Sequence, residues 1–233
     1  QVVTEVDTAA PALLCSGVNM VPNPGFENYV QCPGAFSFLE NAQPWLGWSS
    51  ELYHSCATLA SGVSVPVNWI GTQAPFSGSG YGGAYVYVPG WAGTNSYREY
   101  LTTPLIAPLI AGQSYAVSFR VSRADNCAWG IAEIGAYLGN ISVTNLPNYF
   151  SLTPQVVNPS ANIIISATNW TLISGTFTAA GNEDTLILGN FLTDTNTTAQ
   201  SIGGTFNSGY YYYDDVKVIA LCTNVPVKTV ACD

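Results

Sequence analysis

The chain has 233 residues, of which 48% are hydrophobic and 8% charged, and its 14 acidic residues against 5 basic ones give a net charge of −9. An average soluble domain carries roughly 25% charged residues, so few side chains here keep the surface ionic. The negative charge repels phosphate backbones and anionic lipid heads, which argues against nucleic acid as a partner. No window resembles the roughly 20 apolar residues of a membrane-spanning helix.

In chain order, residues 1–14 read as an extended N-terminal arm, and residues 25–80 form a Gly- and Pro-rich stretch with few clear strands. Segments with alternating apolar residues follow, each bounded by Gly, Pro or Asn, and such alternation is typical of half-buried strands. They lie at 81–88, 114–121, 131–138, 170–178, 185–191 and 210–219. The pattern predicts an all-β, antiparallel β-sandwich over residues 15–221, followed by a C-terminal tail at 222–233.

The six cysteines are even in number and none sits in a CxxC pair, which favours disulfides in an oxidising compartment over a metal site. We expect Cys32 to pair with Cys56, because both lie in the loop-rich region and closing that loop stabilises the fold. We expect the other four cysteines to pair among themselves, and a Cys222–Cys232 loop in the tail is the first expectation. The four are Cys15, Cys127, Cys222 and Cys232. The chain starts at Gln1 without an apolar leader, so we expect a mature secreted protein that is extracellular or attached to the cell surface.

Two ends of the chain resemble carbohydrate-binding modules with the galactose-binding-like jelly roll. The opening motif NMVPNPGFE at 19–27, followed by Trp45 and Trp48, is similar to their first strand, and YYYYDDVKV at 210–218 is similar to their last. Trp170 and the residues after it resemble their penultimate region. The resemblance implies that the sandwich is a jelly roll.

A second resemblance is to surface proteins secreted by Bacteroidota. The motifs that carry it lie at 71–83, 98–101 and 108–115, after the VPNPGFE opening. It implies the same fold and an extracellular location, and it names no ligand.

The carbohydrate-binding resemblance implies a structural calcium ion held by Glu27 and Asp214, with Asp215 as neighbour. A hard cation takes oxygen ligands, and a carboxylate near a strand end needs a positive partner. The alternative is that Glu27 accepts hydrogen bonds from backbone amides while Asp215 faces water.

Aromatic side chains on a rigid face hold sugar rings by stacking. Trp45, Trp48 and Trp170 are expected in the core, whereas three tryptophans in Gly- or Cys-flanked loops, together with nearby tyrosines, are expected to form an exposed glycan platform. This platform comprises Trp69, Trp91, Trp129, Tyr85, Tyr87 and Tyr97.

Arg98 and Glu99 are candidate polar anchors for a sugar, although the favoured interpretation is a buried Arg98 paired with Asp125. His54 lies near Cys56, but one histidine and one disulfide cysteine cannot make a zinc site. No motif of a hydrolase elbow, phosphate loop or zinc protease is present, and the sequence does not place Glu99, Asp125 and Glu133 relative to one another as a glycosidase pair. We therefore expect a protein that is not an enzyme.

Two functions remain. The first is a subunit of an extracellular filament, sheath or coat that self-associates, because a weakly charged surface resists association poorly. The alternative is a carbohydrate-binding module or adhesin that recognises a glycan through exposed Trp and Tyr.

Overall fold

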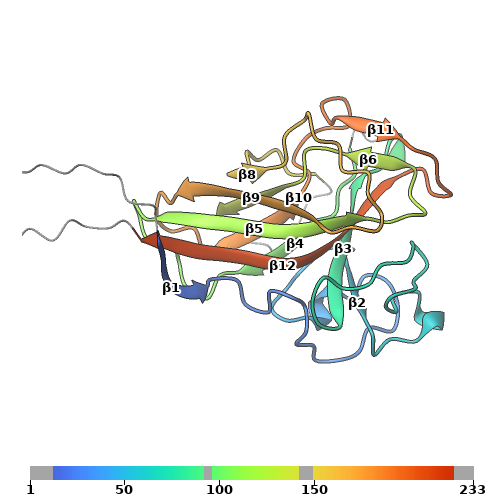
Figure 1. Ribbon diagram of the computed structural model, residues 1–233, viewed down its shortest axis with the longest axis horizontal. Helices are drawn as coiled ribbons and strands as arrows, with labels where there is room; N and C mark the ends of the chain where they lie inside the picture. Colours follow the sequence, from blue (N-terminus) through green and yellow to red (C-terminus); the bar gives the residue numbers. More distant parts are fainter. Residues whose placement is uncertain (1–12, 92–95, 142–148, 223–233) are drawn as a thin grey trace, which may run out of the picture.

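The larger sheet is built on the long C-terminal strand. The computed structural model describes residues 13–91, 96–141 and 149–222. In this sheet the order is β2 (Glu51–His54), β3 (Gly80–Tyr87), β12 (Gly209–Cys222), β5 (Ser114–Arg123) and β9 (Thr171–Thr178), and β1 (Leu13–Asn19) also pairs with β12. All these pairs are antiparallel (Figure 1).

A second sheet packs against the first and completes an antiparallel β-sandwich of the jelly-roll type. Its order is β4 (Leu101–Pro104), β10 (Thr185–Gly189), β7 (Gly135–Gly139) and β8 (Val156–Val157). A short ribbon of β6 (Trp129–Ile131) and β11 (Ala199–Ser201) lies beside them, and two single-turn 3₁₀ helices, η1 (Leu39–Asn41) and η2 (Leu59–Ser61), interrupt the loops. No helix in the described part of the chain is long and apolar enough to cross a membrane.

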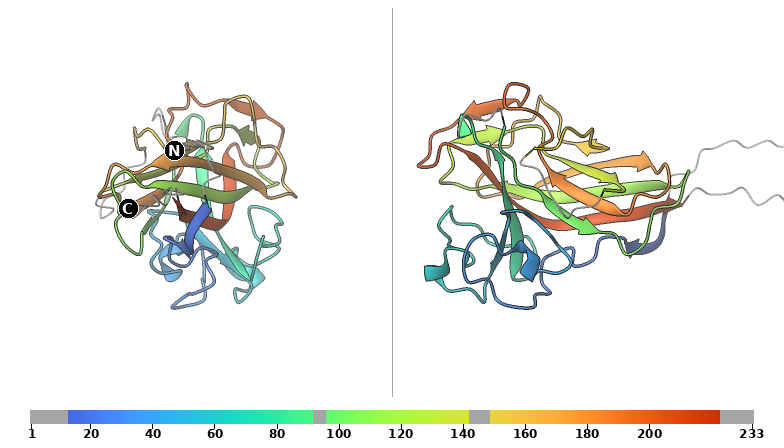
Figure 2. Two further views of the ribbon diagram at one scale, coloured as in Figure 1. Left: turned by 60° about the vertical axis from the view of Figure 1, so that its left-hand side comes forward. Right: turned by 180° about the vertical axis from the view of Figure 1, so that it is seen from behind.

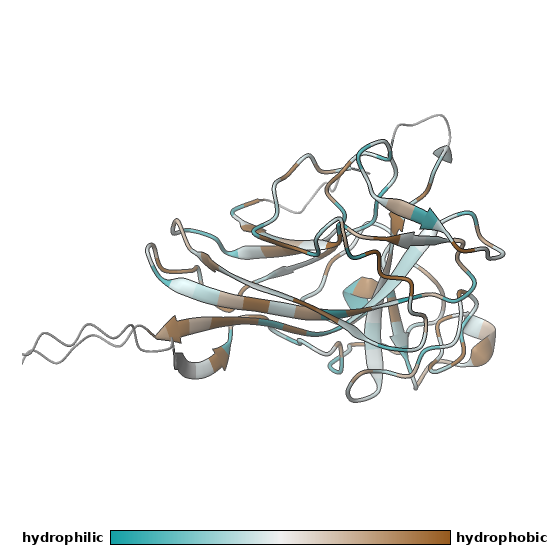
Figure 3. Cartoon of the chain, turned by 45° about the horizontal axis from the view of Figure 1, so that its top comes forward, coloured by the Kyte–Doolittle hydropathy of each residue, from teal (hydrophilic) through white to brown (hydrophobic). Residues whose placement is uncertain are grey.

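The core between the sheets follows from the two-residue period of the strands. Phe119 and Val121 of β5 and Tyr213 of β12 face Leu186 and Leu188 of β10, all of them buried. Figure 3 shows apolar and polar residues alternating along the long strands. Alternate side chains of the larger sheet therefore point to its other face.

That outer face carries a second buried cluster, covered by the loops between β1 and β3. Tyr210 and Tyr212 of β12 pack there with Tyr53 and Tyr81, under Val63 of the loops. The loops gather beside β2 and β3, away from the end where β1 meets the last residues of β12 (Figure 2). The two faces of the larger sheet thus have separate cores.

The disulfide predicted in these loops is confirmed, because Cys32 and Cys56 are bonded with their Cα atoms 6.0 Å apart. The prediction for Cys127 is wrong: it is a buried free thiol, with its Sγ 3.5 Å from the Ser208 hydroxyl. It packs in the outer-face cluster, and this burial raises the pKa of the thiol to about 11. Cys222 is disulfide-bonded, and the proposed Cys222–Cys232 loop lies outside the described residues.

Five of the six predicted strands correspond to β3, β5, β9, β10 and β12. The sixth, at 131–138, is divided between β6 and β7, because a tight turn in which the Ile134 N–H donates to the Ala132 carbonyl breaks it. The predicted arm and tail lie mostly outside the described residues. The described end of the arm pairs with the end of β12, Leu13 with Cys222 and Leu14 with Leu221.

Candidate functional site

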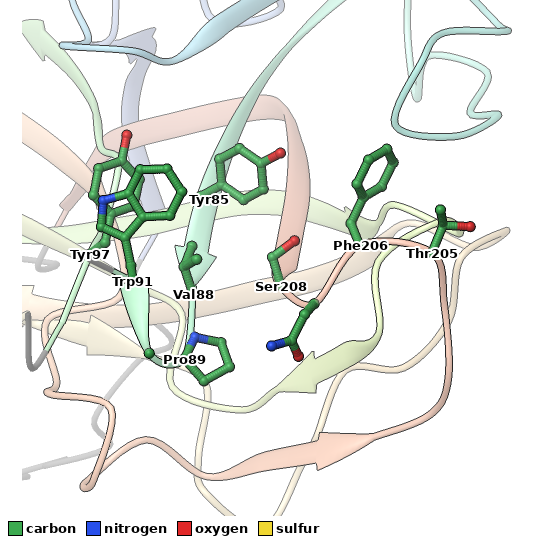
Figure 4. A pocket seen from close by; sticks show the side chains of 10 residues that line it. Tyr85, Val88, Pro89, Trp91, Tyr97, Thr205, Phe206 and Ser208 are labelled. Carbon is green, nitrogen blue, oxygen red and sulfur yellow. The ribbon is translucent and has the colours of Figure 1, made fainter. Parts of the chain in front are cut away.

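Two adjoining cavities form what we call the aromatic groove, at the edge of the outer-face cluster. The first has a volume of about 510 Å³ and the second about 410 Å³, and they share Tyr85, Tyr97 and Phe206 as walls. Figure 4 shows Tyr85 between Trp91 and Tyr97 on one side and Phe206 on the other. The second cavity adds Phe36 and Trp69.

Three separate parts of the chain supply the aromatic walls. Tyr85 projects from β3, and Trp91 and Tyr97 lie on the connection from β3 to β4, with their rings 5.1 Å apart. Phe206 belongs to the connection from β11 to β12, and Trp69 comes from the covering loops. Trp69 is 58% exposed and Trp91 50%, so both present apolar surface to solvent.

The structure brings together four of the six residues expected in the platform. Tyr87 is buried against the sandwich core instead, because β3 has an extra residue where it pairs with Gly209 and Tyr210 of β12, which turns Tyr87 to the other face. Trp129 is half-buried, with its indole Nε1 donating to Asn207 Oδ1 at 2.8 Å. Since Asn207 lines the first cavity, Trp129 supports the groove from behind.

Of the tryptophans expected in the core, Trp45 is fully buried and stacks on Phe26, with ring centroids 4.7 Å apart. The expectation for Trp48 is wrong, because it is 67% exposed. Trp170 is half-buried against the outer-face cluster, where its Nε1 donates to the Ala74 carbonyl at 2.9 Å. Trp45 and Trp48, three residues apart in one loop region, therefore have opposite environments.

Two buried glutamates line the second cavity. The Glu51 carboxylate accepts a hydrogen bond from the Tyr210 hydroxyl, which in turn accepts one from Tyr53 at 3.0 Å. The Glu99 carboxylate accepts from the Tyr85 N–H at 2.9 Å and from the Tyr97 hydroxyl at 2.8 Å. Burial raises the pKa of both carboxyl groups, that of Glu99 to about 7, and repulsion from Glu99 raises the pKa of Glu51 further.

Sequence reasoning found Glu99 and missed Glu51. The signal for Glu51 was its place in the run ELYH, since in a short strand Glu51 and Tyr53 share a face. As expected for adjacent residues, Arg98 and Glu99 diverge, and Glu99 faces the groove. Arg98 is buried, but its ion pair is with Asp194, at 2.7 Å, and not with Asp125, which instead accepts a hydrogen bond from the Thr72 N–H.

The two carboxylates of the predicted calcium site are held by one loop. Glu27 Oε1 accepts from the N–H groups of Ser79 and Gly80 at 2.8 and 3.0 Å. Asp214 Oδ2 accepts from the N–H groups of Phe76 and Ser77 at 2.9 and 3.1 Å. These contacts give Glu27 the amide-binding role of the alternative interpretation, and they bring both carboxylates to the same place.

Asp215 does not face this loop. Its carboxylate pairs with Lys217 at 2.6 Å and with Arg120 at 3.5 Å. A Cβ added to Gly25 would lie 3.6 Å from Asp214 Oδ1 and 3.7 Å from Glu27 Cγ, so those two side chains flank the same glycine. Burial raises the pKa of Asp214 to about 7, as expected for a carboxyl group that has no salt bridge with a basic side chain in the described part of the chain. Within the described residues, no group of three or more His, Cys, Asp and Glu side chains could share an ion.

No protein-family model matches the chain, and no curated protein is significantly similar to it. Among solved structures it is similar to the CBM22-1 and GH10 modules of endo-1,4-β-D-xylanase 10B from Clostridium thermocellum, complexed with xylohexaose, at 14% identity and a TM-score of 0.44. That likeness covers 93% of this chain but only 29% of the xylanase chain.

Two further structures cover most of both chains. The CBM22-1 xylan-binding domain from Paenibacillus barcinonensis has 10% identity and a TM-score of 0.41, over 84% of this chain and 90% of its own. The cleaved adhesin domain of Lys-gingipain from Porphyromonas gingivalis has 12% identity and a TM-score of 0.40, over 86% and 96%. These likenesses concern the fold, and the resemblance to Bacteroidota proteins stays a prediction from the sequence motifs.

Proposed function

We propose that this protein is an extracellular, non-catalytic glycan-binding module whose ligand lies in the aromatic groove. The observation that carries the proposal is the arrangement of Tyr85, Trp91, Tyr97 and Phe206 around one cavity, with Trp69 continuing the surface into the next. Flat aromatic rings bury the apolar faces of sugars, and a small number of polar groups fix their orientation. Such groups line the first cavity at Asn207 and Ser208.

The groove favours this function over the filament, sheath or coat subunit that the composition predicts first. A groove with preformed aromatic walls suits a small, elongated ligand, whereas a subunit interface needs a broad face of at least about 1,000 Å² with good complementarity. The disulfide between Cys32 and Cys56 agrees with an extracellular setting, because disulfides persist in oxidising compartments.

The test is titration calorimetry and affinity electrophoresis with a panel of soluble oligosaccharides, xylohexaose among them. We expect Trp91→Ala and Tyr97→Ala to weaken binding by about tenfold or more, since aromatic contacts dominate such sites. The matched control is Trp48→Ala, which removes another exposed indole that does not line the groove. If wild-type protein binds no glycan, or if Trp48→Ala weakens binding as much, the proposal is wrong.

We also propose that calcium binds between Glu27 and Asp214, without Asp215. The support is the shared loop and the buried Asp214 carboxylate, which a cation would keep charged. Chelation should then lower the melting temperature, because a ligand bound only by the native state stabilises it. Asp214→Asn should abolish that response and Asp215→Asn should retain it, and an unchanged wild-type melt in excess chelator contradicts the site.

A further inference from the structure

The Glu51 and Glu99 carboxyl groups lie together on the wall of the second cavity. Glu51 is opposite Gly83 of β3, and the Glu99 N–H donates to the Tyr85 carbonyl of the same strand at 2.8 Å. Gly83 and Tyr85 are two residues apart, so the two glutamates follow one edge of β3 as neighbours. Both line the cavity although they are only 3% and 4% exposed.

Neither carboxylate has a basic partner within the described residues. Arg98 pairs with Asp194, while Arg120 and Lys217 pair with Asp215. Arg123 donates to the carbonyl oxygens of Ile165, Ala124 and Cys127. Buried carboxylates are normally paired with a cation, so two adjacent ones without a partner form a site that gains free energy when a cation enters.

Hydrogen bonds hold the two carboxylates in place for such a partner. Tyr210 donates to Glu51, and Tyr97 and the Tyr85 amide donate to Glu99. Because these donors fix the acceptor oxygens before a ligand arrives, little ordering is left to be done on binding. Burial raises the pKa of both carboxyl groups, and repulsion from Glu99 raises that of Glu51 further, so an incoming positive charge should displace a proton from the pair.

The other walls of this cavity suit an organic cation. Trp69, Phe36, Tyr85 and Tyr97 surround the glutamates with aromatic rings, and aromatic faces attract ammonium groups. A metal ion instead prefers a shell of oxygen ligands. The cavity therefore matches a primary amine carried on a ring-shaped apolar body.

We propose that the aromatic groove selects glycans with unacetylated amino sugars, whose protonated amine lies against Glu51 and Glu99 while their rings pack on Trp69, Tyr85 and Tyr97. This inference rests on the proposed glycan-binding function and adds the class of sugar. A sugar is favoured over a lysine side chain because the adjoining first cavity continues the groove past Tyr85 and Tyr97 to Trp91, which gives a chain of rings a further surface for stacking.

The experiment compares three probes by titration calorimetry at neutral pH: a glucosamine hexamer, the fully N-acetylated hexamer and a trilysine peptide. We expect the glucosamine hexamer to bind about tenfold or more tightly than the acetylated one, as is typical when a buried charge gains its partner. Repeating the titration in buffers of different ionisation enthalpy should show net proton release for the glucosamine hexamer only.

The variant Glu99→Gln keeps the shape of the side chain and should remove both the preference and the proton release, while binding of the acetylated hexamer persists. Glu51→Gln provides a second variant if the first unfolds, as judged by its melting curve. Glu40→Gln is the matched control, because it removes one exposed negative charge outside the groove.

The outcomes separate this inference from the proposed function. Equal binding of the two hexamers overturns the amine preference and leaves glycan binding intact. Binding of trilysine as tight as that of the glucosamine hexamer also overturns it, in favour of a basic peptide. If no glycan binds either the wild-type protein or Trp91→Ala, both proposals are wrong.

Discussion

The two faces of the larger sheet bury tyrosines in different ways. On the inner face, Tyr211 and Tyr213 of β12 lie among aliphatic side chains of both sheets. On the outer face, Tyr210 and Tyr212 lie in a network of hydroxyl, amide and carboxyl groups, in which Tyr212 donates to Asn68 Oδ1 at 2.9 Å. One strand thus contributes one set of tyrosines to the sandwich core and the other set to the polar network beside the aromatic groove.

The two faces should therefore respond differently to substitution. The inner core depends on close packing between the sheets, so its contribution to stability comes from buried area. The outer cluster depends on satisfied polar groups, so its contribution depends on every partner being present. The predictions below probe the two faces separately.

The largest effect is expected in the inner core. Phe119→Ala removes a fully buried ring that lies 6.2 Å from the ring of Tyr213, and should lower the free energy of unfolding by about 3–5 kcal/mol. Urea denaturation measures this loss. Glycan affinity of the folded fraction should be unchanged, and a large loss of affinity would show that the two faces are not separate.

Loss of the disulfide should destabilise the loops over the outer face. Cys32 and Cys56 are 24 residues apart, and opening a loop of that length costs about 3 kcal/mol in the chain-entropy model. We expect the Cys32→Ser, Cys56→Ser double variant to have a lower melting temperature. On heating it should lose the glycan contact made by Trp69 before the sandwich unfolds. Limited proteolysis would locate early cleavage in residues 30–60, and cleavage that starts in the sandwich strands instead would contradict the prediction.

Tyr210→Phe tests the polar network with a smaller change. It removes the hydroxyl that links Tyr53 to Glu51 and leaves a buried carboxyl group short of a donor, at a cost of about 2 kcal/mol. Tyr115→Phe is the comparison within the inner core, where the hydroxyl accepts from the Ile110 N–H. Equal losses in the two variants would argue against a special role for the network.

The pH dependence of stability should be gradual. Burial raises the folded-state pKa values of Glu99 and Asp214 to about 7, from the ordinary values of 4.5 and 3.8. The native state therefore binds more protons than the unfolded state between about pH 4 and pH 7. Stability should fall as the pH rises through that window, by at most about 1.4 kcal/mol per pH unit for each group.

Melting curves of the metal-free protein at several pH values provide the measurement. Glu99→Gln and Asp214→Asn should each flatten the slope, and Glu40→Gln should leave it unchanged because that side chain is exposed. A stability that rises between pH 4 and pH 7 would contradict the raised pKa values.

Much of the fold could be predicted because local patterns carry it. The alternation in 210–219 identifies β12, and the loop-rich 25–80 stretch holds the predicted Cys32–Cys56 disulfide. The run ELYH places Glu51 on one face with Tyr53, but its contact with Tyr210 could not be predicted, because Tyr210 lies 159 residues further along the chain. Nor could the exposure of Trp48 beside the buried Trp45, since a loop has no period that assigns its side chains to a face.

The sequence by itself determined that the protein is an antiparallel sandwich with a weakly charged surface and loop-borne aromatic residues. Strand alternation, breaker residues and composition are local properties that survive without knowledge of contacts. Only the tertiary structure decided which aromatic residues share a groove. The bulge that turns Tyr87 inward, the pairing of Arg98 with Asp194 and the approach of Glu51 to Glu99 all depend on register between distant strands, and a shift of one residue reverses which face a side chain occupies.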